Sequence, residues 1–125
     1  TFGLRLLSLF KNKSYQRRVY SFGNFICCPA VSYNMERLSD FKFNEELRMA
    51  LDWDAWERIM RRSGHIKYLP ERLMAHRIHS ESETSANTVD KNREKEEYAM
   101  FRRYWGEKMT QFLMKFYVNN QKSNS

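Results

Sequence analysis

Hydrophobic side chains recur at helical spacing in four stretches of the chain. The apolar positions are Phe2, Leu6, Leu9 and Phe10 in the first stretch, Trp53, Trp56 and Met60 in the second, Tyr98, Phe101 and Trp105 in the third, and Met109, Phe112, Leu113, Phe116 and Tyr117 in the fourth. Such spacing places side chains on one face of a helix, and the faces of the last three stretches are expected to lie in the core. The first helix should end near the polar residues 11–14, the second at Gly64 and the third at Gly106. Residues 119–125 are polar and are expected to form a disordered tail.

Three shorter stretches have the pattern of strands. Residues 25–31 form a continuous apolar run, and residues 65–69 and 73–79 are short segments separated by Pro70. Pro29 interrupts the first run, and a proline there indicates a strand edge, a bulge or a strand end. The pattern therefore predicts a mixed α/β fold of one domain over residues 1–125, in which a few short strands pack with amphipathic helices and two helices lie at the C-terminus.

Basic residues outnumber acidic ones along the chain. Lys and Arg total 22 against 15 Asp and Glu, which gives a net charge of +7. Such a charge attracts anions, including nucleic acid, acidic lipid and nucleotide diphosphates. The arginines occur as short pairs at 17–18, 61–62 and 102–103, and they form no continuous stripe of the kind that binds a duplex. Nucleic acid is therefore not the expected partner.

Cys27 and Cys28 are the only cysteines, and they are adjacent inside the apolar run at 25–31. Neighbouring side chains on a strand point to opposite faces, so the pair is poorly placed for a disulfide or a shared metal. We expect buried thiols in a reducing compartment. This favours a cytoplasmic protein, with the inner face of the membrane as a second location.

Two carboxylates, Asp52 and Asp54, stand at the start of the helix predicted within residues 47–64. Negative charge is favoured there because the first amides of a helix lack partners and the dipole is positive. Asp54, with Glu57 three residues later, has the layout of a capping box and is assigned as a structural cap. Asp52 has two interpretations, either a second helix-start carboxylate or a general base.

His76 and His79 suggest a metal site. Residues three apart on a strand face opposite sides of a sheet, so one ion could not easily bind both. A role for His79 alone, at the junction between strand and loop, survives this objection.

Several segments match a known family in the same order along the chain. They are Gly23-Asn24-Phe25-Ile26 through Pro29-Ala30-Val31, Phe-Asn-Glu-Glu-Leu at 43–47, Asp52-Trp53-Asp54 with Trp56 and Arg58, Gly64 with Tyr68 and Leu69, and Arg77-Ile78-His79 followed by Ser82, Glu83 and Thr84. Together they resemble the C-terminal half of family 2 glycosyltransferases, enzymes with the GT-A nucleotide-diphospho-sugar transferase fold. The chain departs from the family at Leu51, where many members have Glu.

The resemblance implies roles for individual residues. Asp52 matches the catalytic base, which takes a proton from an acceptor hydroxyl as it attacks a nucleotide-diphospho-sugar with inversion. Asn24 and Trp53 would border the acceptor, a saccharide or a lipid-linked sugar. Arg77 would lie beside the diphosphate, and His79 would complete the shell of a divalent cation, Mn²⁺ or Mg²⁺.

The spelling Asp52-Trp53-Asp54 also fits the family's Asp-x-Asp metal motif, but that motif ends an apolar strand in the N-terminal half. Here charged residues at 45, 46 and 48 precede the motif and a helix follows it, so we reject a metal role for the pair. The cation would be held mostly by residues outside this chain, which is expected to be a fragment that is inactive alone.

Two alternatives stay open. The first is a basic helical module that binds nucleic acid or an acidic membrane surface and is indifferent to Asp52→Asn. The second is a hydrolase that uses Asp52, Asp54 and His79 around a metal. Self-association is also expected, because a fragment with an incomplete sheet exposes an apolar edge.

Overall fold

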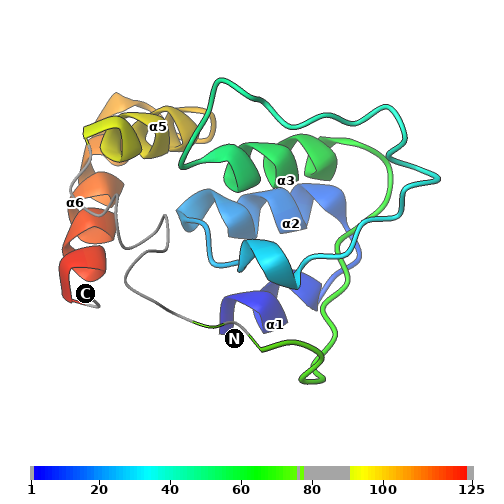
Figure 1. Cartoon of the computed structure of the whole chain (residues 1–125). Coiled ribbons are helices and arrows are strands. Elements are labelled where there is room, and N and C mark those ends of the chain that lie inside the picture. Colours follow the sequence, from blue (N-terminus) through cyan, green and yellow to red (C-terminus); the bar gives the residue numbers. More distant parts are fainter. Residues whose placement is uncertain (1, 76, 78–90, 124–125) are drawn as a thin grey trace.

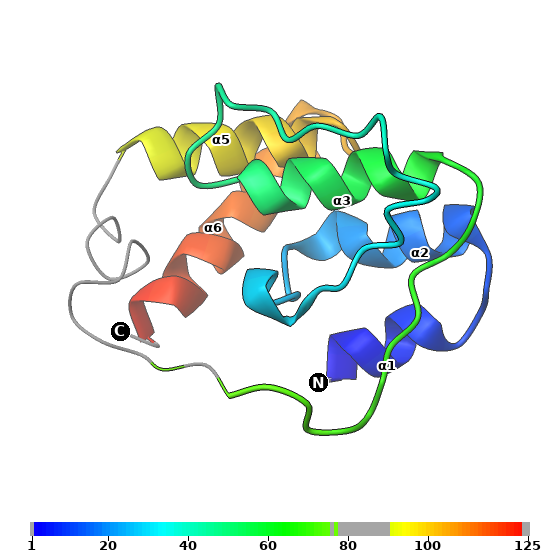
Figure 2. The same ribbon diagram turned by 45° about the vertical axis from the view of Figure 1, so that its right-hand side comes forward.

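The computed structural model describes residues 2–75, 77 and 91–123. Its elements are α1 (Phe2–Ser8), α2 (Lys13–Val19), the 3₁₀ helices η1 (Tyr20–Phe22) and η2 (Cys28–Ala30), α3 (Leu51–Arg61), α5 (Lys91–Arg102) and α6 (Glu107–Ser123). α1 packs on α2, α2 on α3, and α5 on α6 (Figure 1). The turned view in Figure 2 shows α3 between α2 and α5.

The described residues contain no strand, so the prediction of a mixed α/β fold is wrong for this part of the chain. Residues 25–31 form irregular backbone around η2, which contains Pro29, and residues 65–75 are irregular throughout. The described residues therefore have no sheet edge through which the chain could self-associate. Residues 76 and 78–79 of the third predicted strand lie outside them.

The Gln16 side chain explains how one extended segment is held without a neighbouring strand. Gln16 lies on α2 and is 1% exposed. Its amide nitrogen donates to the Ile66 carbonyl at 2.7 Å, and its amide oxygen accepts from the Ile66 N–H at 2.8 Å. These are the two bonds that a strand partner would make. One side chain therefore satisfies the backbone where the sequence pattern predicted a ladder.

The core lies between α3 and its neighbours. Its buried hydrophobic side chains are Leu7, Tyr20, Ala50, Trp53, Trp56, Met60, Met100 and Phe101. The predicted inner face of the second helix, Trp53, Trp56 and Met60, is confirmed as buried. Tyr20 meets both tryptophans edge to face, with ring centroids 6.2 Å apart in each pair. Aromatic packing of this kind fixes the orientation of α3 as well as its burial.

The two predicted C-terminal helices are present, but their outer face differs from the prediction. Phe112 and Phe116, expected in the core, are 54% and 57% exposed. Tyr117, the last position of the same predicted stripe, does face the core, against Phe101 and Trp53. Its ring fits because Gly23 has no Cβ, since a Cβ there would lie 2.7 Å from Tyr117 Cε2. α6 also continues to Ser123, beyond the start of the predicted tail at 119.

Candidate functional site

The predicted base and one predicted acceptor-binding residue meet in the structure. Asp52 is the second residue of α3, and Asn24 follows η1 directly after Gly23. The Asn24 Nδ2 atom donates to Asp52 Oδ1 at 3.1 Å, and the Trp53 N–H donates to the same oxygen at 2.7 Å. Both residues are half-buried. Residues 28 positions apart in sequence therefore form one polar site at the first turn of α3.

Tyr20 fixes the orientation of the Asn24 amide. The Tyr20 hydroxyl donates to Asn24 Oδ1 at 2.5 Å, and the Ile26 N–H donates to the same oxygen at 3.2 Å. Because an amide oxygen accepts and an amide nitrogen donates, these two bonds leave the nitrogen for Asp52. Tyr20 is itself fully buried. No sequence pattern pointed to Tyr20, because an aromatic ring alone gives no sign of a polar role.

Burial raises the pKa of Asp52 above its ordinary value, although the Trp53 amide, the Asn24 side chain and the charge of Arg93 act in the opposite direction. The ionised form is disfavoured because part of its hydration is lost. A carboxylate with a raised pKa is a stronger base than an ordinary one.

The negative charge of Asp52 also raises the pKa of four neighbouring groups, Tyr20, Cys28, Tyr33 and Tyr117. Burial is the larger cause of the raised pKa in each case, and the Asp52 charge adds to it. Cys28 and its neighbour Cys27 are exposed, so the expectation of buried thiols is wrong. The reason is that residues 25–31 form irregular backbone and η2 at the surface, and no buried strand.

Glu96 of α5 holds the backbone that leads into α3. Its carboxylate accepts from the N–H groups of Arg48, Met49 and Ala50 at 3.1, 2.8 and 2.9 Å. Ala50 is the N-cap of α3 and offers no side-chain cap. The Glu96 carboxylate of α5 thus satisfies the backbone N–H groups at the start of α3, where the sequence predicted a capping side chain from α3 itself. No local pattern could have identified Glu96, because it lies 46 residues after Ala50.

Asp54 is not the cap that the sequence predicted. It lies inside the first turn of α3, is 1% exposed, and pairs with Arg58 at 2.8 Å and Arg103 at 2.7 Å. Glu57, the predicted second residue of the capping box, is also 1% exposed. It binds three arginines instead: Arg17 at 3.0 Å, Arg61 at 2.6 Å and Arg103 at 3.3 Å. These two carboxylates join α2, α3 and the end of α5. Arg58 and Arg103 occupy the Asp54 carboxylate. Asp54 therefore cannot share a metal with Asp52, as the hydrolase interpretation requires.

The remaining predicted site residues lie elsewhere. Trp53 is 1% exposed and packs edge to face on Phe101 at 5.0 Å, so it presents no surface to an acceptor. Arg77 is exposed on irregular backbone. His79 lies outside the described residues.

The expected divalent cation finds no ligand set in the part of the chain that the structure describes. No three His, Cys, Asp or Glu side chains gather there in a way that could hold a metal ion. Asp54 and Glu57, the carboxylates nearest to Asp52 in sequence, are both occupied by arginines. The described residues therefore offer no ligand set for the cation, which the resemblance assigns mostly to residues outside this chain, and they contribute proton transfer alone.

Comparison with known proteins adds no assignment. No protein-family model matches the chain, and neither a curated protein nor a solved structure matches it.

Proposed function

We propose that this chain supplies the general base of an inverting glycosyl transfer, with Asp52 as the base and Asn24 as its positioning residue. The donor would be a nucleotide-diphospho-sugar and the acceptor a saccharide or lipid-linked hydroxyl. The observation that carries the proposal is the Asn24–Asp52 hydrogen bond at 3.1 Å, because two residues that the resemblance assigns to one site are in contact. The helical fold gives no support, so the proposal rests on these side chains and on the ordered matching segments.

The geometry around Asp52 suits proton abstraction. The hydrogen bonds from Asn24 and Trp53 both end on Oδ1. Among the described residues, no hydrogen bond from another residue ends on Oδ2. Oδ2 can therefore accept the proton of an acceptor hydroxyl while Oδ1 keeps the carboxylate oriented. The raised pKa increases the basicity of this oxygen.

The reaction step assigned to this chain balances as one displacement. The acceptor hydroxyl gives its proton to Asp52 Oδ2 as its oxygen bonds to the anomeric carbon, and the bond from that carbon to the nucleotide diphosphate breaks. Attack opposite the leaving group inverts the anomeric centre. A divalent cation would offset the charge of the leaving diphosphate, and the described residues supply no ligands for one.

A transfer assay with product analysis tests the proposal. UDP-, GDP- and dTDP-sugars would be offered with Mn²⁺ or Mg²⁺ to the native protein that contains these residues and to this chain alone. We expect transfer with an inverted anomeric configuration, read by NMR, in the native protein only, because the nucleotide-binding groups are assigned elsewhere. A retained configuration, or turnover by this chain alone, would contradict the proposal.

A further inference from the structure

The outer face of α6 carries an exposed apolar stripe. Met109, Phe112 and Phe116 are 45%, 54% and 57% exposed and follow each other at spacings of three and four residues, which places them in line along one helix face. The rings of the two phenylalanines lie 4.9 Å apart. Thr110 and Tyr117, on the other side of α6, hold the helix against the core. The stripe therefore lies on the surface because the opposite side of α6 packs against the core.

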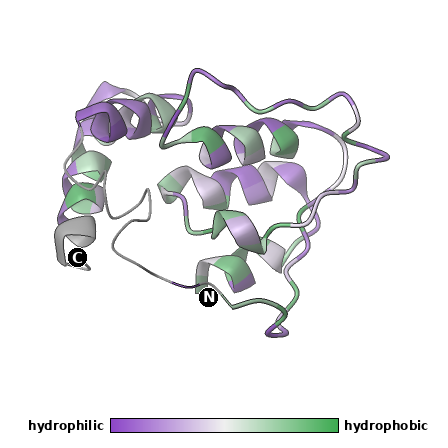
Figure 3. Cartoon of the chain, viewed as in Figure 1, coloured by the Kyte–Doolittle hydropathy of each residue, from purple (hydrophilic) through white to green (hydrophobic). Residues whose placement is uncertain are grey.

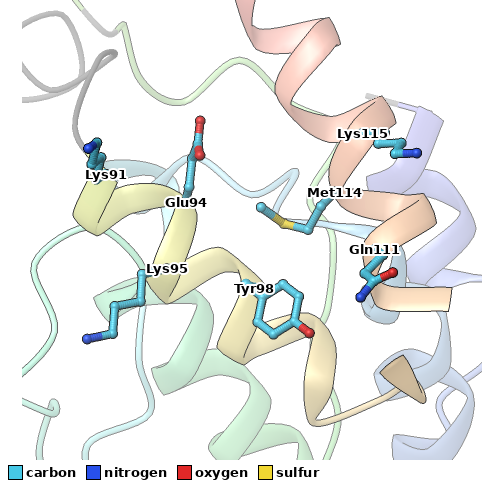
Figure 4. A pocket seen from close by; sticks show the side chains of 7 residues that line it. All are labelled: Lys91, Glu94, Lys95, Tyr98, Gln111, Met114 and Lys115. Carbon is cyan, nitrogen blue, oxygen red and sulfur yellow. The ribbon is translucent and has the colours of Figure 1, made fainter. Parts of the chain in front are cut away.

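A groove with three lysines lies beside this stripe. It occupies about 590 Å³ between α5 and α6, with Lys91 and Lys95 on one side and Lys115 on the other (Figure 4). Tyr98 and Met114 extend between the two helices, and Glu94 is the one carboxylate among the lining residues. Lys115 is three residues after Phe112, so it lies on α6 between the groove and the stripe.

The α6 stripe and the lysine groove both lie on the surface of the layer formed by α5 and α6. α5 is mostly hydrophilic along its length, whereas α6 has hydrophobic turns (Figure 3). No helix in the described ranges is both long and apolar enough to cross a membrane. An amphipathic helix of this kind, with aromatic side chains beside lysines, is typical of helices that lie in the plane of a lipid surface.

We propose that this face, made of the α6 stripe and the lysine groove, binds the surface of an anionic lipid bilayer. The phenylalanines enter the boundary between headgroups and acyl chains, and the lysines contact lipid phosphates. Charge complementarity favours this occupant over a second copy of the chain. A symmetric pairing through the same face would bring two lysine-rich surfaces together, in a chain with a net charge of +7. An anionic surface instead attracts each lysine within a Debye length.

Vesicle sedimentation tests this proposal without any need for enzymatic activity. The protein would be mixed with vesicles of phosphatidylcholine alone and of phosphatidylcholine with about one third phosphatidylserine. We expect binding at least about tenfold stronger to the anionic vesicles, weakening as salt is raised. The double variant Phe112→Ser/Phe116→Ser and the triple variant Lys91→Gln/Lys95→Gln/Lys115→Gln should each lose most of this binding. All five positions are exposed, so these variants should fold, and circular dichroism checks that they do.

Matched controls lie on other parts of the surface. Leu73→Ser changes a side chain that is 70% exposed, and Lys67→Gln removes an exposed lysine. Both variants should bind like the unchanged chain. Equal binding to neutral and anionic vesicles, or equal loss in the controls, would overturn the proposal. A dimer seen by light scattering that disappears in Phe112→Ser/Phe116→Ser, without vesicle binding, would assign the face to a second copy instead.

Discussion

The Asn24 side chain donates to the Asp52 carboxylate at 3.1 Å and so connects the segment after η1 to the first turn of α3. Asn24 is in turn held by the Tyr20 hydroxyl, which is part of the aromatic core. The chain Tyr20–Asn24–Asp52 therefore leads from the core to a half-buried acid. Packing of the core thus sets the orientation of the residue to which we assign the chemistry.

Asp52→Asn should raise stability at neutral pH. The pKa of Asp52 is raised in the folded state, so the folded protein binds more protons than the unfolded one between the ordinary Asp pKa and the raised value. Stability is therefore lost as pH rises through that window, and an amide avoids the loss. The melting temperature of the variant should exceed that of the unchanged chain at pH 7, and the difference should vanish below about pH 3.9.

Asp40→Asn is the matched control, for which the change in melting temperature should have the opposite sign. The Arg62 side chain, which binds Asp40 at 2.8 Å, lowers the pKa of this carboxyl. Its stabilisation is present above the ordinary Asp pKa and is lost as pH falls. The variant should melt slightly lower at pH 7, and only slightly, because the side chain is 71% exposed. The same direction of change in both variants would contradict the assigned environments.

Gly23→Ala should destabilise the protein by about 2 kcal/mol. Gly23 has φ +143°, which side chains rarely adopt, and an added Cβ would lie 2.7 Å from Tyr117 Cε2. Tyr117 would have to leave its place on Phe101, and the Asn24 segment would shift with it. Urea denaturation measures the change. Gly106→Ala is the control, since no atom lies within 4 Å of its Cβ, and it should cost less than about 1 kcal/mol.

Glu96→Ala should loosen the start of α3. Three backbone N–H groups lose their acceptor, which should cost about 1–2 kcal/mol in unfolding free energy and speed hydrogen exchange at Arg48, Met49 and Ala50. Glu94→Ala, on the exposed side of the same helix, is the control. Unchanged exchange at those three amides would show that Glu96 does not hold them in solution.

Glu57→Gln should cost about 3 kcal/mol, because three arginines lose the buried charge that they share. Denaturation by urea measures the loss. The control is Glu45→Gln, at an exposed position, which should change stability by less than about 0.5 kcal/mol. A loss equal to that of the control would mean that the cluster contributes nothing to stability.

Helical periodicity predicted α1, α3, α5 and α6, because their apolar positions repeat over several turns. It failed for α2, whose buried residue is the polar Gln16 and whose one local signal is Asn12, a cap that accepts from the Ser14 and Tyr15 amides. The strand predictions failed because an apolar run does not reveal its hydrogen-bond partner. The partner of Ile66 is a glutamine side chain 50 residues away.

The candidate site was partly predictable. The resemblance placed Asn24 and Asp52 together, and the structure brings them into contact. The resemblance also gave Trp53 a role at the acceptor, whereas helical spacing placed it in the core, and its burial agrees with the spacing. Nor could it find Tyr20 or Glu96, which act through long-range contacts.

The most direct test of the proposed base is glycosyl transfer by Asp52→Asn in the native protein that contains these residues. We expect kcat to fall by a factor of about 10²–10⁴, the usual contribution of a general base, while Asp40→Asn stays within about twofold of the unchanged protein. Circular dichroism would confirm that both variants are folded. Activity of Asp52→Asn equal to that of Asp40→Asn would contradict the assignment of Asp52 as the base.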